Sequence, residues 1–288
     1  MAKKTVVLMG AGGKMGCRIT DNIKDLDRYE VHYVEISETG IRNLAERGLK
    51  PTPAEEALPG AEIVVLALPD KLIPAITQDI VPRLNAGTLL VTLDPAAAFA
   101  GAIPIREDLT YFVTHPCHPP LFGETNHAGE IDWFGGVHQS QHIVCALLHG
   151  PEQDYASGEA VARDMFGNAR CPVLGAHRVT VEQMAMLEPA LVETFAATLV
   201  YAIKELGEET VKRGVPRPAM EAFLRGHLRI ILAIVFGHAG FPFSDGALLA
   251  IAKAKRRIFL PEWKENLMNP ENIRRSVEEI IGKVSVEG

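Results

Sequence analysis

Two histidines in a proline-rich turn are the side chains of this chain best suited to move a proton. They stand in the sequence THPCHPP, which begins at Thr114, and its three prolines restrict where the rings of His115 and His118 can point. An imidazole can accept the proton of a hydroxyl group near neutral pH, and it can equally bind a metal ion. We predict that His115 is catalytic, whereas for His118 we favour the alternative of an ordinary loop histidine.

A glycine-rich loop near the N-terminus predicts a dinucleotide site. Residues 4–16 read KTVVLMGAGGKMG, an apolar run followed by glycines and then by apolar residues at helical spacing. Such glycines allow a tight turn and a close approach of the backbone to a pyrophosphate, which then faces the N-terminus of a helix. The predicted cofactor-binding residues are Gly10, Ala11, Gly12, Gly13, Lys14, Met15, Gly16, Glu35, Leu68, Pro69 and Asp70.

Glu35 indicates which dinucleotide this loop takes. It follows the next predicted strand, about 20 residues beyond the loop, where a carboxylate can accept hydrogen bonds from two ribose hydroxyls. The same carboxylate would repel a 2′-phosphate, and residues 36–39, with the sequence ISET, supply no basic side chain to hold one. The sequence therefore favours NAD over NADP.

The elements that must position these residues alternate over the first part of the chain. Continuous apolar runs predict strands, and they are typical of a parallel sheet that is covered on both faces. They occupy residues 63–68, 89–93, 111–113, 142–148 and 171–174. Ligands bind at the carboxyl ends of such strands, where Asp94 and Thr114 stand with His115. We predict an α/β fold in which residues 1–176 form an NAD-binding Rossmann domain with a doubly wound parallel sheet.

Residues 177–288 indicate an all-helical second domain, which would bind substrate and mediate dimerisation. One long helix is expected over 180–206, broken only by Pro189. Residues 187–206 and 228–235 are apolar on most of the helix circumference, and such helices need to be covered. A domain of this size can hardly cover both by itself, so we predict a homodimer.

Together these motifs resemble a known superfamily of dehydrogenases. Its members join a Rossmann domain to a helical domain similar to that of 6-phosphogluconate dehydrogenase, and its prephenate dehydrogenases carry a His-Pro motif that His115-Pro116 matches. The glycine-and-lysine helix motif of the β-hydroxyacid dehydrogenases is missing, and Lys204 sits late in its helix. A lysine acid or base is therefore not expected. The whole chain most resembles the family of D-apionate oxidoisomerases.

That resemblance implies NAD-dependent oxidation of a branched sugar acid, followed by an acyloin-type migration that gives 3-oxo-isoapionate. Migration requires a deprotonated alcohol beside a polarised ketone, and a divalent metal that bridges both oxygens can provide this, magnesium or manganese before zinc. Glu182, Glu188 and Glu193 are the carboxylates near the start of the long helix. We predict His115 and Glu188 as ligands and Glu193 as a supporting or dimer contact. The alternative is that the last two glutamates face solvent.

Composition limits the remaining possibilities. The 288 residues carry a net charge of −7, which argues against a nucleic-acid partner. The longest apolar run, 230–236, is shorter than the about 20 residues that cross a bilayer, so no membrane partner is expected. Four cysteines without paired spacing predict a reducing, cytoplasmic location. They are Cys17, Cys117, Cys145 and Cys171.

Other functions stay open at this point. A plain NAD-dependent hydroxyacid dehydrogenase would use the same loop and the same histidine. A semialdehyde dehydrogenase would use Cys117 as its nucleophile, with His115 or His118 close enough to lower the pKa of the thiol. A protein that binds NAD without catalysis is the third alternative.

Overall fold

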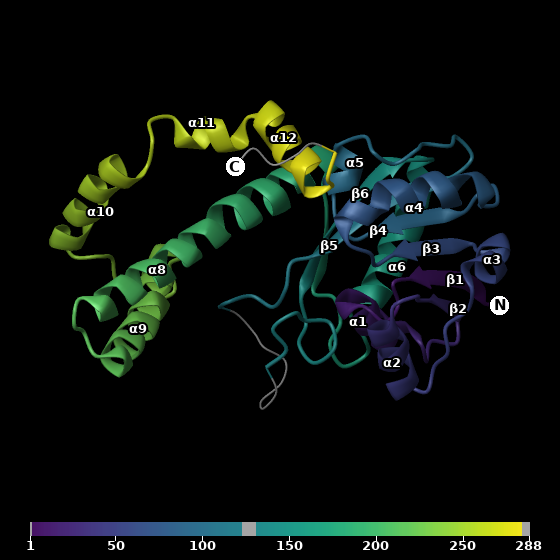
Figure 1. Ribbon diagram of the computed structural model, residues 1–288, viewed down its shortest axis with the longest axis horizontal. Helices are drawn as coiled ribbons and strands as arrows, with labels where there is room; N and C mark the ends of the chain where they lie inside the picture. The colour runs from purple at the N-terminus through teal and green to yellow at the C-terminus, as the bar shows by residue number, and fades with distance from the viewer. Residues whose placement is uncertain (1, 123–130, 284–288) are drawn as a thin grey trace. The chain divides into compact units, whose positions relative to one another are not determined.

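The computed structural model describes residues 2–122 and 131–283 (Figure 1). The chain divides into two compact units, one formed by Met1–Met186 with Arg274–Gly288 and the other by Leu187–Ile273. This division differs from the domain boundary predicted at 176/177, because it falls later in the chain and the C-terminal residues return to the first unit. The assignment of substrate binding and dimerisation to 177–288 stays a prediction.

The first unit contains a seven-stranded sheet in the order β2-β1-β3-β4-β5-β6-β7. Its strands are β1 (Lys4–Met9), β2 (Tyr29–Val34), β3 (Ile63–Leu66), β4 (Leu89–Thr92), β5 (Thr110–Pro116), β6 (His142–His149) and β7 (Gly175–Arg178). The first five strands pair in parallel, and β1 lies between β2 and β3. This confirms the predicted Rossmann sheet, whose order switches at β1. Strand β6 departs from the prediction because it runs antiparallel to β5.

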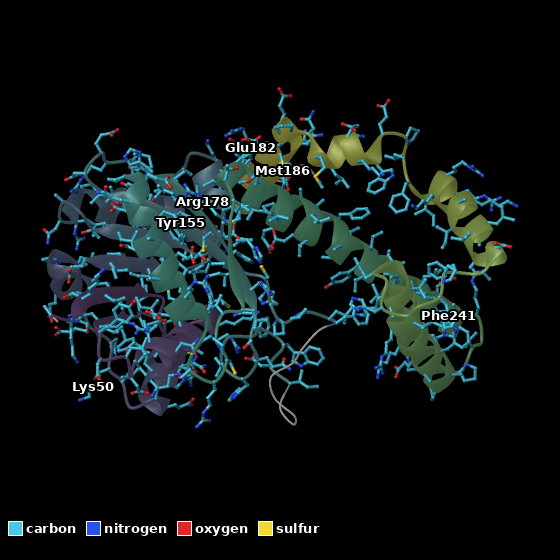
Figure 2. All side chains as sticks on the ribbon, turned by 180° about the vertical axis from the view of Figure 1, so that it is seen from behind. Lys50, Tyr155, Arg178, Glu182, Met186 and Phe241 are labelled. Carbon is cyan, nitrogen blue, oxygen red and sulfur yellow. The ribbon has the colours of Figure 1, made fainter. Side chains whose placement is uncertain are left out.

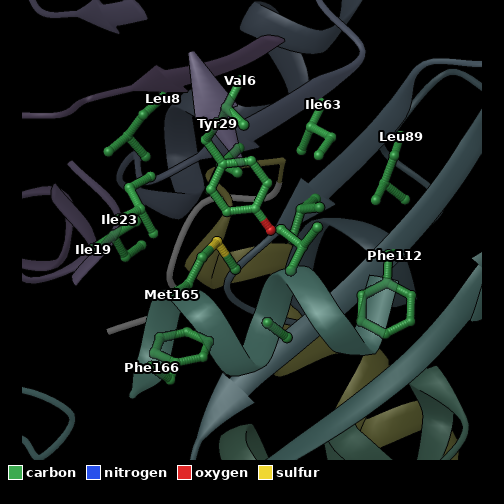
Figure 3. Packing of buried hydrophobic residues seen from close by; sticks show 14 of the residues in the cluster. Val6, Leu8, Ile19, Ile23, Tyr29, Ile63, Leu89, Phe112, Met165 and Phe166 are labelled. Atoms are coloured by element: carbon green, nitrogen blue, oxygen red, sulfur yellow. The ribbon is translucent and has the colours of Figure 1, made fainter. Parts of the chain in front are cut away.

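Helices cover this sheet and explain why its strands are continuously apolar. Those of the first unit are α1 (Lys14–Ile23), α2 (Glu38–Glu46), α3 (Ala54–Ala57), α4 (Ile73–Ile80), α5 (Ala96–Phe99), α6 (Tyr155–Phe166), α7 (Val181–Ala185) and most of α12 (Pro270–Ile280). Ile19 of α1 and Phe166 of α6 belong to one buried cluster with Leu8 and Ile63 (Figure 3). Val7 points to the opposite face and is equally buried.

The last strand begins later than predicted, since residues 171–174 form no strand. Cys171 instead ends a turn in which its backbone N–H donates to the side-chain oxygen of Asn168 at 3.0 Å. Strand β7 follows this turn, and the guanidinium of Arg178 at its end lies 4.3 Å from the centre of the Tyr155 ring (Figure 2). This contact fastens the edge strand to α6.

The second unit begins within one continuous helical run. Helix α7 leads into a π-helical stretch, Met186–Ala197, which continues as α8 (Thr198–Lys212). The long helix predicted over 180–206 is confirmed, but Pro189 does not break it. Pro189 lies in the first turn of the π-helical stretch, and its carbonyl group accepts a hydrogen bond from the Thr194 hydroxyl at 2.6 Å. The remaining helices are α9 (Arg217–Val235), α10 (Asp245–Ile258) and α11 (Trp263–Met268).

The second unit, taken by itself, exposes many large apolar side chains. No residue of α9 or α10 is buried. The exposed side chains include Val200, Tyr201, Leu206, Phe223, Ile230, Ile231, Val235, Leu248, Leu249 and Ile258. By length and composition alone, the helical run Val181–Lys212 could cross a membrane. The absence of a membrane partner, expected from the short run 230–236, therefore stays a prediction.

Candidate dinucleotide and catalytic site

The glycine loop joins the end of β1 to the start of α1. Gly10 has a φ of +74°, and a side chain there would overlap the carbonyl group of Ala67. A side chain at Gly16 would overlap the Gly10 carbonyl oxygen, so glycine lets α1 begin directly against the loop. Ala11 is fully buried between them. The structure thus requires glycine at both positions, and the contact of this loop with a pyrophosphate stays a prediction.

Gly12 lies against an element that the sequence did not reveal as part of the site. The backbone of α2 at Gly40 is so close that a side chain at Gly12 would overlap it. A side chain at Gly40 would in turn overlap the carboxylate of Glu35. The sequence held one signal of this contact, namely Gly40 within the helix α2. Glycine inside a helix costs about 1 kcal/mol relative to alanine, so its presence there points to a close contact that excludes a side chain.

The Glu35 carboxylate is held beside the glycine loop. One oxygen accepts hydrogen bonds from the backbone N–H groups of Ser37 (2.8 Å) and Ile36 (2.9 Å) and from the Ser37 hydroxyl, and the other accepts from the N–H of Gly12 at 3.0 Å. Burial by itself would raise the pKa of Glu35, but these hydrogen bonds outweigh it, and the pKa is lowered. An ionised carboxylate at the end of β2 suits the recognition of a ribose diol.

A cavity of about 340 Å³ lies beside the glycine loop, at the carboxyl ends of β3, β4 and β5. Seven predicted site residues line it, namely Gly13, Lys14, Met15, Leu68, Pro69, Asp70 and His115. Its volume falls within the range of small-ligand sites, about 300–1,000 Å³. The fold therefore brings the predicted cofactor residues and the predicted catalytic histidine to one place.

His115 lies inside β5 rather than in the turn that follows it, because the strand extends to Pro116. Its Nδ1 is 2.8 Å from the Leu93 carbonyl oxygen and 3.7 Å from a carboxylate oxygen of Asp94. A carbonyl oxygen can only accept, so Nδ1 carries the proton, and the neutral ring has its lone pair on Nε2. This tautomer suits Nε2 to accept a proton or to bind a metal ion, and Asp94 would stabilise the protonated ring.

The neighbours of His115 differ from their predicted positions. Thr114 does not line the cavity, because its hydroxyl is buried and donates to the Val144 carbonyl group at 3.0 Å. The backbone of His118 has a φ of +59°, and its Nδ1 lies 3.0 Å from the carbonyl oxygen of Phe134. His118 is therefore packed rather than simply solvated. Cys117 is exposed and is in no disulfide, and its role as a nucleophile stays a prediction.

Thr92 is a cavity residue that was not predicted. It is the last residue of β4, its exposed fraction is 4%, and its hydroxyl has no hydrogen-bond partner in the described part of the chain. A buried hydroxyl without a partner costs about 1–3 kcal/mol, so a ligand that paired with it would recover free energy on binding. The orphaned hydroxyl and the glycine loop together fit a site built for a polar cofactor.

The predicted metal site combines residues of the two units. Glu188 lies in the π-helical stretch of the second unit and is half-buried, whereas Glu182 and Glu193 are exposed. Across residues 2–122 and 131–283, no three His, Cys, Asp or Glu side chains form a group that could hold a metal ion. Metal binding by His115 and Glu188 therefore stays a prediction.

Comparison with known proteins gives matches over almost the whole chain. Residues 1–122 match the NADPH-binding domain of acetohydroxy acid isomeroreductase, and residues 123–281 match the C-terminal domain of decarboxylating phosphogluconate dehydrogenase. The D-apionate oxidoisomerase of Rhizobium rhizogenes is 45% identical, over 96% of this chain and 98% of its own length. The D-apionate oxidoisomerase of Cupriavidus necator is 44% identical, over 96% of this chain and 99% of its own length.

A solved structure agrees with these relatives. It is described as a semialdehyde dehydrogenase NAD-binding protein from Cupriavidus necator in complex with calcium and NAD. It is 43% identical to this chain and superposes with a TM-score of 0.88. The match covers 96% of this chain and 99% of the solved chain. The Rossmann fold and the NAD-dependent oxidoreductase class are thereby confirmed. With identities of 44–45% over 96% of its length, the chain belongs to the D-apionate oxidoisomerase family.

Proposed function

We propose that this chain oxidises the branched sugar acid D-apionate with NAD and rearranges the product to 3-oxo-isoapionate. The names of its relatives and the lining of the cavity support this reaction. The observation that carries the proposal is the tautomer of His115. With Nδ1 bonded to the Leu93 carbonyl oxygen, Nε2 is the ring atom with a lone pair for the reacting groups.

The first task of the site is to bind NAD, which supplies the hydride acceptor when bound. The glycine loop would face its pyrophosphate, and Glu35 would accept hydrogen bonds from a ribose diol while repelling a 2′-phosphate. Thr92 offers a buried hydroxyl to a polar group of the ligand. One matched family is described as NADPH-binding, but Glu35 favours NAD in this chain.

The two predicted roles of His115 compete for one atom. The Leu93 carbonyl oxygen engages Nδ1, so Nε2 must serve both as a proton acceptor and as a metal ligand. One lone pair cannot do both at the same moment. In the oxidoisomerase reaction we assign Nε2 to metal binding, and the hydroxyl proton would pass to water. In the alternative function, a plain NAD-dependent dehydrogenase, Nε2 accepts that proton and Asp94 stabilises the protonated ring.

We further propose that His115 and Glu188 hold magnesium or manganese. An imidazole with a carboxylate, acting on an oxygen-rich substrate, suits these hard cations. A relative was solved with calcium, another cation of this kind. When bound, the cation would polarise two neighbouring substrate oxygens, which is what migration of a carbon group requires and hydride transfer does not.

One experiment separates the two reactions. The enzyme is incubated with NAD and D-apionate, NADH is followed by absorbance, and products are identified by NMR. We expect EDTA to abolish product formation and magnesium or manganese to restore it. Glu188→Gln should behave like the chelated enzyme, because an amide is a poorer ligand for a hard cation. Glu182→Gln, at an exposed position on α7, is the matched control and should keep full activity.

Either of two results would reject the oxidoisomerase reaction. If the enzyme stays fully active in excess EDTA and yields only a simple 2-oxo acid, the plain dehydrogenase is correct. If Cys117→Ala abolishes activity while Glu188→Gln does not, the semialdehyde dehydrogenase replaces both.

We also propose that the chain acts as a homodimer in the cytoplasm, on a small-molecule substrate. The exposed apolar side chains of α8, α9 and α10 support a second copy as the partner. None of the four cysteines, which all lie in the described part of the chain, is in a disulfide, as expected in a reducing compartment. The net charge of −7 disfavours nucleic acid as a partner.

A further inference from the structure

Residues 131–141, which we name the clamp segment, are fastened to helix α1 by a partly buried ion pair. Arg18 of α1 donates to the carboxylate of Asp132 and to the carbonyl oxygen of Gly135. The Asp132 side chain is only 4% exposed. Its carboxylate also accepts hydrogen bonds from the backbone N–H groups of Gly135 (3.1 Å) and His138 (2.9 Å). A buried carboxylate with this many donors holds the segment in one conformation.

Phe134 is the residue that this segment brings to the glycine loop. The Nζ of Lys14 lies 3.6 Å from the centre of the Phe134 ring, and the Arg18 guanidinium lies 5.7 Å from it. The 3.6 Å contact is well within the range at which the face of an aromatic ring attracts a cation. Lys14 is the first residue of α1 and the one lysine or arginine among the described residues that line the cavity of His115.

Phe134 is also held by a second residue, His118. Its carbonyl oxygen lies 3.0 Å from Nδ1 of His118, and the two rings pack edge to face with their centres 5.9 Å apart. The backbone of His118 is left-handed, a conformation that is uncommon for a non-glycine residue. Two independent contacts, from α1 and from the turn after β5, therefore determine where the Phe134 ring lies.

We propose that Phe134 is a positioning residue that holds the Lys14 ammonium group in place to contact the pyrophosphate of bound NAD. A free lysine side chain loses much conformational entropy when it is ordered by a ligand. The Phe134 ring removes part of that cost before the cofactor arrives, and the N-terminus of α1 adds its own attraction for the anion. This inference depends on NAD binding at the glycine loop and not on which sugar acid is oxidised.

The test is a double-mutant cycle on dissociation constants, measured by calorimetry for wild type, Phe134→Leu, Lys14→Gln and the double variant. Phe134→Leu should weaken NAD binding about two- to fivefold, the effect of losing one cation–π contact. The double variant should bind no more weakly than Lys14→Gln, because the ring acts only through that amine. Phe134→Tyr keeps the aromatic face and should stay within about twofold of wild type.

Three probes distinguish positioning from a general loosening of the loop. ADP-ribose carries the pyrophosphate without the nicotinamide, so Phe134→Leu should weaken it as much as NAD. Adenosine has no phosphate and should bind wild type and Phe134→Leu equally. Additive effects in the cycle, or equal weakening of adenosine, would overturn the proposal. If Phe134→Leu does not fold, a Phe134→Tyr variant with weakened NAD binding would overturn it as well. Failure of D-apionate turnover would leave these binding results intact.

Discussion

Glu35 is the residue whose environment makes the most direct prediction. Hydrogen bonds from Ser37, Ile36 and Gly12 lower its pKa, so the carboxylate stays ionised in mild acid. NAD should bind at least tenfold more tightly than NADP, about 1.4 kcal/mol. The affinity for NAD should persist from about pH 8 to pH 5 and fall only as the pH falls through the lowered pKa of Glu35. Calorimetry with both cofactors at each pH measures it.

Two results would contradict this role of Glu35. Equal dissociation constants for NAD and NADP near neutral pH would show that the carboxylate does not select the ribose. Because the 2′-phosphate of NADP gains a proton at about pH 6, the affinity for NAD alone is the second test. A loss of NAD affinity around pH 6 would show that the pKa of Glu35 is raised rather than lowered. Glu35→Gln should reduce the preference at every pH.

His115 makes the second prediction at this scale. Replacing it with alanine removes the Nε2 lone pair and should lower kcat by roughly 10²–10⁴. The NAD dissociation constant should change less than about twofold, because His115 belongs to β5 whereas the glycine loop follows β1. His32→Ala, on the edge strand β2, is the control and should keep kcat. Turnover within a few fold of wild type would make His115 structural.

At the scale of elements, the contact between α2 and the glycine loop gives a prediction. A side chain at Gly40 would displace the flexible end of Glu35, so Gly40→Ala should weaken NAD binding and reduce the preference over NADP. Stability should change little, since the alanine gains about 1 kcal/mol of helix propensity. Gly12→Ala meets rigid backbone instead and should lower the free energy of unfolding by about 1–3 kcal/mol.

Gly60→Ala is the matched control for this pair, because a side chain there would meet open space. Calorimetry and thermal unfolding of the three variants check the prediction. Unchanged cofactor affinity in Gly40→Ala would show that Glu35 does not need its observed position.

Elements with a clear local pattern were predictable from the sequence, and those set by distant contacts were not. The strand, glycine loop and helix of residues 4–23 follow from apolar periodicity and glycine spacing, and the structure has them. The start of β7 depends on a turn organised by Asn168, which no periodicity reveals. The position of Phe134 depends on Lys14, far earlier in the chain. The tautomer of His115 depends on a carbonyl group of another strand end.

At the scale of the whole molecule, the apolar surface of the second unit predicts association. Helices α8 and α9 border a groove of about 720 Å³ that is lined almost entirely by apolar residues, Phe223 and Ile231 among them. Light scattering should give about twice the chain mass of 31.4 kDa for wild type. Phe223→Glu combined with Ile231→Glu should give the monomer mass while NAD still binds.

Arg225→Glu, an exposed polar position on the same helix, is the control and should leave the mass unchanged. A wild-type monomer would reject the dimer. Recovery of wild type in the membrane fraction would point to the run Val181–Lys212 as a bilayer contact instead.

The return of α12 to the first unit sets the order in which that unit can be completed during synthesis. Arg274 donates to the Phe99 carbonyl group at 3.1 Å, and Val277 on the same helix is fully buried. These partners are 175 residues apart, so a ribosome that adds about 5–20 residues per second makes them roughly 9–35 s apart. The first unit therefore stays incomplete until α12 has been made, and until then the nascent unit must tolerate an uncovered patch at Phe99.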